Sequence, residues 1–259
     1  MFERRKLYGV LTSAVVVGTL FVAGATSVAA AGNGQCSGGT IAPGTYGNLV
    51  ITGFCTLDGG NVTVQRNLHV TSTGAMEGLF ASSRLTVGGN VIVDSGGLFA
   101  LGCDPVELPC LDNPDATTSD VVGRSIISDH PALMIVHDNH VGGNVVQGGG
   151  GLGLACNPLL PDGTPDYVDY ALNTIGGSAT VTGLRTCWAG FSHNVVGGNV
   201  NYHDNQTGIP DGNLADGNRI GGNFNCTANN PAPHLSDGPV QTLNVVGGAV
   251  RGQCIAISS

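Results

Sequence analysis

One short phrase recurs along this chain and limits what the chain can fold into. Three copies have the sequence Val-Gly-Gly-Asn-Val, and four looser copies keep the glycine doublet. The copies are Val87–Val91, Val141–Val145, Val196–Val200, Asp58–Val62, Ile175–Ala179, Ile220–Phe224 and Val246–Val250. Successive copies are 29, 54, 34, 21, 24 and 26 residues apart, and residues 67–74 align with residues 90–97 at a shift of 23. The unit is therefore 21–26 residues, which is typical of a solenoid of stacked repeats.

The residues between these phrases indicate strands. Apolar side chains alternate with polar ones, as at Leu85 and Val87 or Val91 and Val93, which is the period of a β-strand. β-Branched residues dominate, and the 43 glycines do not bring the low hydrophobicity of a disordered chain. Each unit is expected to contain a strand, a Gly-Gly-Asn corner, a second strand and a looser corner. Glycine would serve the corner by adopting positive φ without steric cost.

A second asparagine recurs three residues before the first glycine of five copies. These residues are Asn139, Asn173, Asn194, Asn218 and Asn244. Stacked at one period, their amides could hydrogen-bond from coil to coil. We therefore predict an all-β parallel β-helix over residues 32–259, with eight or nine coils and a length of about 40 Å. A β-sandwich is the alternative, but it would not need the same corner phrase seven times.

Residues 1–31 have the pattern of a signal peptide. Arg4, Arg5 and Lys6 precede an apolar stretch over residues 7–25, and small residues precede the predicted cleavage site. An uncleaved membrane anchor is the alternative. Cleavage would leave six arginines, no lysine and 17 acidic residues, a net charge of −11. That balance excludes a basic nucleic-acid-binding surface and a catalytic lysine, and we expect no stable membrane insertion once the signal is removed.

All eight cysteines follow the predicted signal. An even number of cysteines in an exported chain indicates disulfides, although eight cysteines allow 105 pairings. Pairing of nearest neighbours gives Cys36–Cys55, Cys103–Cys110, Cys156–Cys187 and Cys226–Cys254. A structural zinc site would need closely spaced cysteine pairs, and the sequence has none.

The rhythm of the repeat resembles that of known bacterial proteins. The x-Val-Gly-Gly-Asn-Val-x-Val pattern is similar to right-handed β-helices, including the polymer-forming bactofilins and the coils of pectate lyases. Over residues 36–259 the chain more closely resembles exported bacterial parallel β-helix repeat proteins of unassigned function, through Thr186–Phe191, Ile220–Cys226 and Gly248–Cys254. The resemblance implies a right-handed parallel β-helix. Bactofilins are cytoplasmic and poor in cysteine, so the signal and the cysteines depart from them.

Two segments interrupt the period and are predicted to be loop insertions. Residues 103–131 carry six acidic residues and four prolines, and residues 148–174 begin with four glycines and carry three aspartates. Clusters of proline and glycine mark loops. Loops on a rigid scaffold are where binding residues are usually found.

The tripeptide His-Asp-Asn occurs twice, at residues 137–139 and 203–205. His137, Asp138, His203 and Asp204 are therefore candidates for acid–base catalysis or cation binding. Asp204, Asp211 and Asp216 are weaker candidates for a calcium site, although no calcium-loop motif is present. The competing interpretation is that these residues are polar positions on the outer faces and turns of the helix.

These observations favour a non-catalytic module that is secreted and works at the cell surface or in the extracellular matrix, without a cofactor. Its partners would be polysaccharides or other cell-surface components, and it could self-associate. One alternative is a carbohydrate-active enzyme, a polysaccharide lyase or hydrolase, because parallel β-helices carry such activities. The other is an adhesin stabilised by a cation such as calcium.

Overall fold

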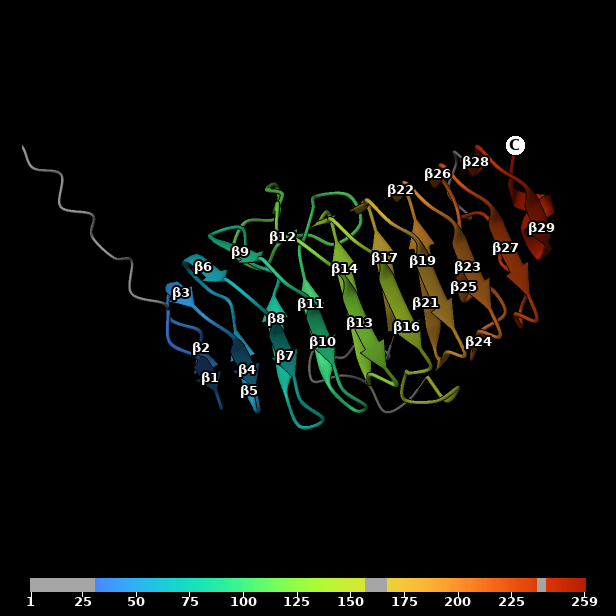
Figure 1. Cartoon of the computed structure of the whole chain (residues 1–259). Coiled ribbons are helices and arrows are strands. Elements are labelled where there is room, and N and C mark those ends of the chain that lie inside the picture. The colour runs from blue at the N-terminus through green and yellow to red at the C-terminus, as the bar shows by residue number, and fades with distance from the viewer. Residues whose placement is uncertain (1–30, 157–166, 237–240) are drawn as a thin grey trace, which may run out of the picture. The chain divides into compact units, whose positions relative to one another are not determined.

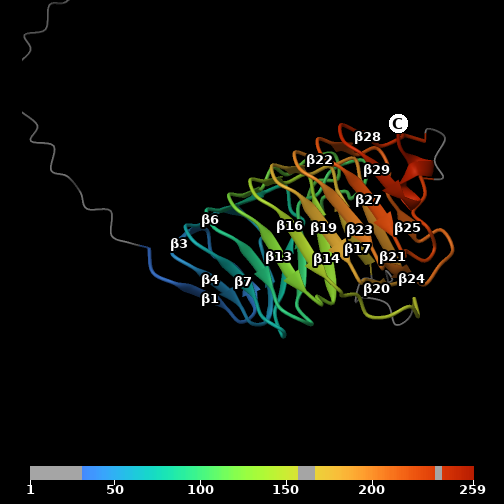
Figure 2. The same ribbon diagram turned by 45° about the vertical axis from the view of Figure 1, so that its right-hand side comes forward.

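The computed structural model describes residues 31–156, 167–236 and 241–259. The predicted signal peptide lies outside these residues, apart from Ala31. Residues 31–259 form one unit in which every described strand pair is parallel and the chain winds in stacked coils (Figures 1 and 2). Three long sheets form the sides of the helix, and no facing antiparallel layers of a sandwich are present among the described residues. The prediction of an all-β parallel β-helix is confirmed.

Within the described residues, sheet A has ten strands: β1 (Gly34–Cys36), β4 (Leu49–Ile51), β7 (Leu68–Val70), β10 (Val91–Val93), β13 (Ile126–Asp129), β16 (Val145–Gly148), β19 (Ala179–Thr182), β23 (Val200–His203), β27 (Phe224–Thr227) and β29 (Val250–Gly252). Sheet B consists of β2 (Gly39–Thr40), β5 (Phe54–Thr56), β8 (Ala75–Gly78), β11 (Leu98–Leu101), β14 (Leu133–His137), β17 (Tyr167–Ala171), β21 (Trp188–Ser192) and β25 (Asn213–Leu214). Sheet C consists of β3 (Gly44–Tyr46), β6 (Gly60–Val64), β9 (Ser83–Val87), β12 (Val121–Val122), β15 (His140–Val141), β18 (Thr174–Ile175), β22 (Val195–Val196), β26 (Arg219–Ile220) and β28 (Val245–Val246). A short sheet D pairs β20 (Arg185–Thr186) with β24 (Gln206–Thr207), and a 3-10 helix, η1 (Gln253–Ile257), follows β29.

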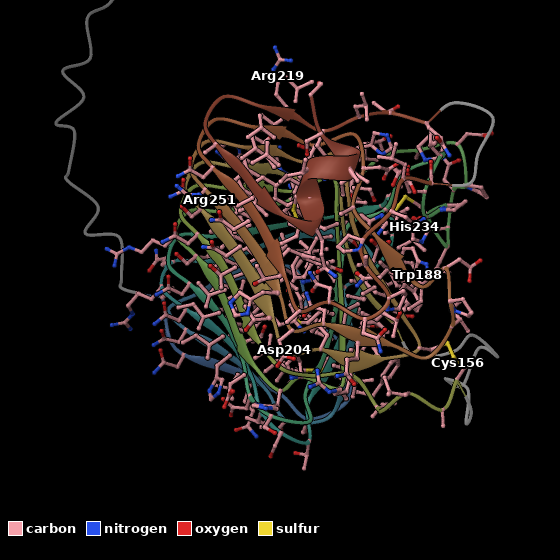
Figure 3. All side chains as sticks on the ribbon, turned by 90° about the vertical axis from the view of Figure 1, so that its right-hand side faces the viewer. Cys156, Trp188, Asp204, Arg219, His234 and Arg251 are labelled. Carbon is pink, nitrogen blue, oxygen red and sulfur yellow. A yellow bond between two sulfur atoms is a disulfide. The ribbon has the colours of Figure 1, made fainter. Side chains whose placement is uncertain are left out.

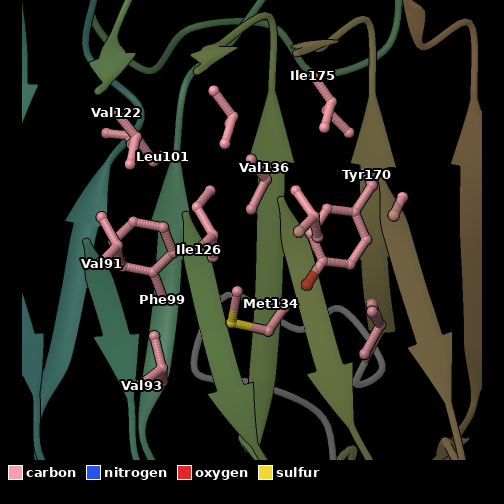
Figure 4. Close-up of a cluster of buried hydrophobic side chains, with 14 of the residues drawn as sticks. Val91, Val93, Phe99, Leu101, Val122, Ile126, Met134, Val136, Tyr170 and Ile175 are labelled. Atoms are coloured by element: carbon pink, nitrogen blue, oxygen red, sulfur yellow. The ribbon is translucent and has the colours of Figure 1, made fainter. Parts of the chain in front are cut away.

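Inward side chains of the three sheets stack in columns and form the main core. On β10 and β13, Val91 lies beside Ile126, and on β11 and β14, Phe99 lies beside Met134. Figure 4 shows these side chains filling the space between the sheets. All four are less than 1% exposed, so each coil buries apolar area against the coils above and below it.

The six glycine doublets that precede sheet A serve close packing of the corners rather than positive φ, whereas Gly59 and Gly60, before Asn61 of sheet C, have the predicted positive φ. The positive-φ glycines include none of the doublets that precede sheet A, which corrects the expectation from the sequence. A Cβ on Gly176 would lie 2.6 Å from the carbonyl oxygen of Gly142, one coil earlier, and a Cβ on Gly247 would lie 2.7 Å from that of Gly221. The coils therefore stack so closely at this corner that only glycine fits.

An asparagine or serine next to each of these corners links successive coils. The side-chain oxygen of each residue accepts the backbone N–H of the corresponding residue in the next coil. We call this set the outer asparagine ladder: Asn33, Asn48, Asn67, Asn90, Ser125, Asn144, Ser178, Asn199 and Asn223. Asn61 follows the doublet Gly59-Gly60 but is not a member, because it lies in β6 of sheet C and both glycines of its doublet have a positive φ. Sheet A has ten described strands, one from each coil, where eight or nine coils were predicted. The number was underestimated because some coils have no glycine doublet at this corner.

Four of the five asparagines in the second set form the amide-to-amide ladder that was predicted. Asn139 differs, because its side-chain amide donates to the carbonyls of Leu101 and His137 and only its backbone N–H reaches Asn173. In this buried asparagine ladder, the side-chain amides of Asn173, Asn194 and Asn218 each donate to the side-chain oxygen of the asparagine in the next coil, at 2.8–3.1 Å. These three and Asn244 are no more than 1% exposed. The same amides also donate to backbone carbonyls, as Asn194 does to Tyr170. The ladder therefore satisfies polar groups along the inside of the corner between sheets B and C.

The two insertions are narrower than predicted. The first covers residues 102–120, between β11 and β12, rather than 103–131, and the second lies between β16 and β17 rather than over 148–174. Residues 121–129 and 167–174 were mistaken for loop because they lie next to proline and glycine clusters, but their side chains continue the columns of the helix. Residues 157–166 of the second insertion lie outside the described residues.

All eight cysteines are described and form disulfides, each with its nearest neighbour in the sequence. The pairs are Cys36–Cys55, Cys103–Cys110, Cys156–Cys187 and Cys226–Cys254. Such a set is typical of a protein from an oxidising compartment. In the described part of the chain, no helix has the length and apolar character needed to cross a bilayer.

Candidate functional site

The two His-Asp-Asn tripeptides occupy corners of the helix. In each, histidine ends a strand, aspartate turns the chain with a positive φ (51° at Asp138 and 55° at Asp204), and asparagine enters a hydrogen-bonded stack. Aspartate is one of the few non-glycine residues that adopt this conformation readily. Corner geometry is therefore sufficient to explain why this sequence occurs twice.

The structure does not bring the two tripeptides together. His137 ends β14 in sheet B, whereas His203 ends β23 in sheet A. The coils that contain β17 and β21 lie between the two histidines along the helix. His203 and Asp204 are exposed, and the Asp204 carboxylate lies 3.5 Å from the Arg185 guanidinium. Figure 3 shows Asp204 at a corner of the helix, away from Trp188 of sheet B. The four candidates do not form one groove.

His137 instead lies in a buried cluster on the outer face of sheet B. Its Nε2 is 2.8 Å from Oδ2 of Asp169, on the next strand, and its Nδ1 is 3.4 Å from Oδ2 of Asp104, in the insertion 102–120. The three residues are 1%, 7% and 3% exposed, respectively. A histidine enclosed between two carboxylates in this way has no surface for a substrate, so its evident role is to join the insertion to the sheet.

A second contact between insertion and sheet lies close by. Glu107 Oε1 is 3.4 Å from Nδ1 of His193, at the corner between β21 and β22, and both side chains are about one-third exposed. Sequence reasoning treated Asp104 and Glu107 only as loop residues and Asp169 as part of a loop. The alternation of Tyr167, Asp169 and Ala171 with inward Val168 and Tyr170 is the signal that could have placed Asp169 on the outer face.

Burial and the carboxyl groups gathered here shift three pKa values. Burial disfavours the imidazolium of His137, but hydrogen bonds and charges from Asp169 and Asp104 outweigh burial and raise its pKa. Burial, followed by the charge of Asp169, raises the pKa of Glu107. Burial and the charge of Asp104 raise the pKa of Asp138. His137, Glu107 and Asp138 therefore retain protons more strongly than the same groups do in water.

The three candidate calcium ligands are not grouped. Among the described residues, no set of three histidine, cysteine or acidic side chains has the spacing of a metal site. Asp204 is exposed at its corner and Asp216 is 1% exposed, with Oδ2 accepting the Ser236 N–H at 3.4 Å. Asp211 borders a cavity of about 570 Å³ beside Pro231 and His234. These residues do not support a shared ion site.

The outer face of sheet A carries a shallow groove. It has a volume of about 280 Å³ and is bordered by Val50, His69 and Ile92 together with Asn33, Asn48 and Asn67 of the outer asparagine ladder. His69 Nε2 lies 2.8 Å from Oδ2 of Asp94, and both side chains are accessible. Unlike the His137 cluster, this groove is open to a ligand.

The fold and these surfaces define a parallel β-helix with an enclosed polar cluster and an open sheet face. Comparison of the chain with protein-family models, with curated proteins and with solved structures gives no match.

Proposed function

We propose that the chain is a non-catalytic structural or interaction module that works outside the cytoplasm, at the cell surface or in the surrounding matrix. The outer face of sheet A carries this proposal, because one outward side chain from each described strand joins a single row. The row consists of Gln35, Val50, His69, Ile92, Ile127, Val146, Thr180, Asn201, Asn225 and Arg251.

Such a row suits an extended partner. Neighbouring parallel strands are about 4.8 Å apart, so the face presents a side chain at that interval along its length. The first part of the row is mainly apolar and includes the groove, with Ile127 and Val146 exposed by 41% and 39%. The later part is polar, from Thr180 to Arg251. A polysaccharide, with apolar ring faces and hydroxyl groups repeating along a chain, matches both parts.

Two further observations support the proposal, and an expected handedness accompanies it. The disulfides and the predicted signal favour a secreted protein. The helix is expected to be right-handed, since crossover connections between parallel strands of one sheet almost always are. The recurring histidines and aspartates also have structural explanations, at corners and in the enclosed His137 cluster.

Co-sedimentation of the exported chain with insoluble cellulose, chitin and peptidoglycan tests the proposal. We expect binding to at least one polymer, with no release of soluble sugar. Ile127→Glu should abolish that binding, because it places a charge in the middle of the row. Val195→Glu is the matched control, since Val195 is 46% exposed on sheet C, and it should bind like the unmodified chain.

Three outcomes would overturn the proposal. Cleavage of a polymer would show that the chain is an enzyme. Equal binding by the Ile127→Glu and Val195→Glu variants, or no binding of any polymer by the unmodified chain, would remove the role of sheet A.

A further inference from the structure

The insertion 102–120 folds back onto the outer face of sheet B. Leu108 packs on an apolar patch formed by Leu79, Ala100, Leu133 and Ile135, which is separate from the main core. The backbone N–H of Leu111 donates to the carbonyl of Leu79 at 2.9 Å. The insertion therefore covers apolar side chains of sheet B that would otherwise face solvent.

The insertion is stiff at the point where its polar contacts begin. The Cys103–Cys110 disulfide closes a short loop, and Thr118 bonds the backbone of Cys103 through its hydroxyl. Inside this loop, Oδ1 of Asp104 accepts the backbone N–H groups of Val106 and Glu107 at 2.8 and 2.7 Å. Those bonds fix the carboxylate so that its other oxygen, Oδ2, faces His137.

His137 can satisfy both of its carboxylate neighbours only when it is doubly protonated. A neutral imidazole has one N–H donor and one acceptor, whereas imidazolium donates from both nitrogens. With a neutral ring, one nitrogen lone pair must face a buried carboxylate oxygen. Asp169 lies at 2.8 Å and Asp104 at 3.4 Å, so the contact with Asp104 is the weaker one and the one expected to be lost.

We infer that residues 102–120 form a pH-sensitive clasp, which is closed over sheet B while His137 carries a proton and released when His137 loses it. Release would expose the side of the apolar patch of Leu79, Ala100, Leu133 and Ile135 that Leu108 covers. This inference does not depend on the proposed role of sheet A.

The carboxyl groups around His137 all favour its imidazolium form. Asp104, Glu107, Asp138 and Asp169 face it with carboxyl groups, and His193 is the one further histidine in the cluster. Because the pKa of His137 is raised above 6.5, the contacts stabilise the closed form below that pH and are lost as pH rises through the folded-state pKa.

The test combines a titration of His137 with hydrogen exchange of the clasp in the folded, disulfide-bonded chain. Nuclear magnetic resonance of the His137 ring gives its pKa, which we expect above 6.5. Exchange protection factors for residues 104–118, corrected for intrinsic rates, are then compared about two pH units below and above that pKa. We expect protection to fall by about tenfold or more at the higher pH, with protection in the strands of residues 195–227 unchanged.

Two variants make the test specific. In Asp104→Asn, the side-chain amide can donate to the lone pair of a neutral ring, so the clasp should stay protected at the higher pH. His69→Gln breaks the His69–Asp94 pair on sheet A, at the same 2.8 Å, and should leave the pH response intact. A His137 pKa at or below 6.5, clasp protection equal at the two pH values in the unmodified chain, or an Asp104→Asn variant that opens as the unmodified chain does, would each overturn the inference.

Discussion

At the scale of single residues, Asp120 stands where the buried asparagine ladder would have another asparagine. Val121 of β12 pairs with His140 of β15, so Asp120 corresponds to Asn139 in the next coil. The Asp120 side chain is 1% exposed and accepts the Leu85 N–H at 2.6 Å. Burial raises its pKa to about 6, despite that hydrogen bond and the charge of Arg84. The Asp120 carboxylate serves as a buried hydrogen-bond acceptor, a role that a neutral asparagine amide can fill without burying a charge.

Asp120→Asn should therefore stabilise the protein at neutral pH. The pKa of the folded state exceeds the unfolded value of 3.8, so ionisation of Asp120 removes stability as pH rises from about 4 to about 6. The amide keeps an acceptor for Leu85 and carries no charge. We expect a gain of up to about 3 kcal/mol at pH 7 and none below about pH 4, measured by urea denaturation.

The control is Asp112→Asn, which removes an exposed carboxylate. Slight burial would raise the pKa of Asp112, but the hydrogen bonds that it accepts from Ser82 and Ala81 outweigh burial and lower it, so this variant should give no gain. Equal stability of Asp120→Asn and the unmodified chain at both pH values would contradict this prediction.

The close approach at the glycine corners can be tested at Gly176. An added methyl group would lie 2.6 Å from the carbonyl oxygen of Gly142, a backbone atom that cannot move without shifting a coil. We expect Gly176→Ala to cost about 2 kcal/mol or more in the free energy of unfolding. Gly148→Ala is the matched control, because its Cβ would meet only Asp129 at 3.9 Å and its φ is not positive. Similar denaturation midpoints for the two variants would show that the corner tolerates a side chain.

At the scale of structural elements, the buried asparagine ladder connects coils whose strands already pair. Asn194 is an inner member of the ladder: its side-chain amide donates to Tyr170 and Asn218, and its oxygen accepts the backbone and side-chain N–H groups of Asn173. Each bond is buried, so removal of one asparagine leaves polar groups in both neighbouring coils without partners.

Asn194→Ala should consequently destabilise the helix by about 3 kcal/mol or more. Asn225→Ala serves as the control, because Asn225 lies on the outer face of sheet A and, within the described part of the chain, its side-chain amide donates to Asn201. We expect the control to cost less than about 1 kcal/mol. Thermal and urea denaturation of both variants measure the difference, and a cost for Asn194→Ala no larger than that of the control would mean that strand pairing alone holds the coils together.

The elements also show which features the sequence could predict and which it could not. The Gly-Gly-Asn period and the alternation of apolar and polar residues were sufficient to predict the parallel β-helix, because both patterns recur from one coil to the next. The sequence could not show why the doublets are glycine, because a positive φ and a close approach between two coils both require glycine at the same position. The His137 cluster was missed because Asp104, His137 and Asp169 come from an insertion and two coils. Their meeting depends on the register of β14 with β17, which no local pattern encodes.

At the scale of the whole molecule, a solenoid is stabilised by contacts between neighbouring coils, so its last coil depends on what covers it. Here η1 folds over the end of the core. Ile257 is 5% exposed within the main core, and its carbonyl accepts N–H groups from the backbone and side chain of Asn244. One residue thus covers the apolar column and terminates the buried asparagine ladder.

Ile257→Asp should open this end of the helix. A charge in place of a buried side chain would displace η1, exposing apolar residues and leaving the Asn244 amides without their acceptor. We expect a lower Tm and concentration-dependent self-association in sedimentation velocity, because an uncovered edge of parallel strands is a surface for pairing with another chain. Ile255→Asp changes a residue of the same helix that is 64% exposed, and should remain as stable and as monodisperse as the unmodified chain. If both variants behaved alike, η1 would not be the element that protects this end.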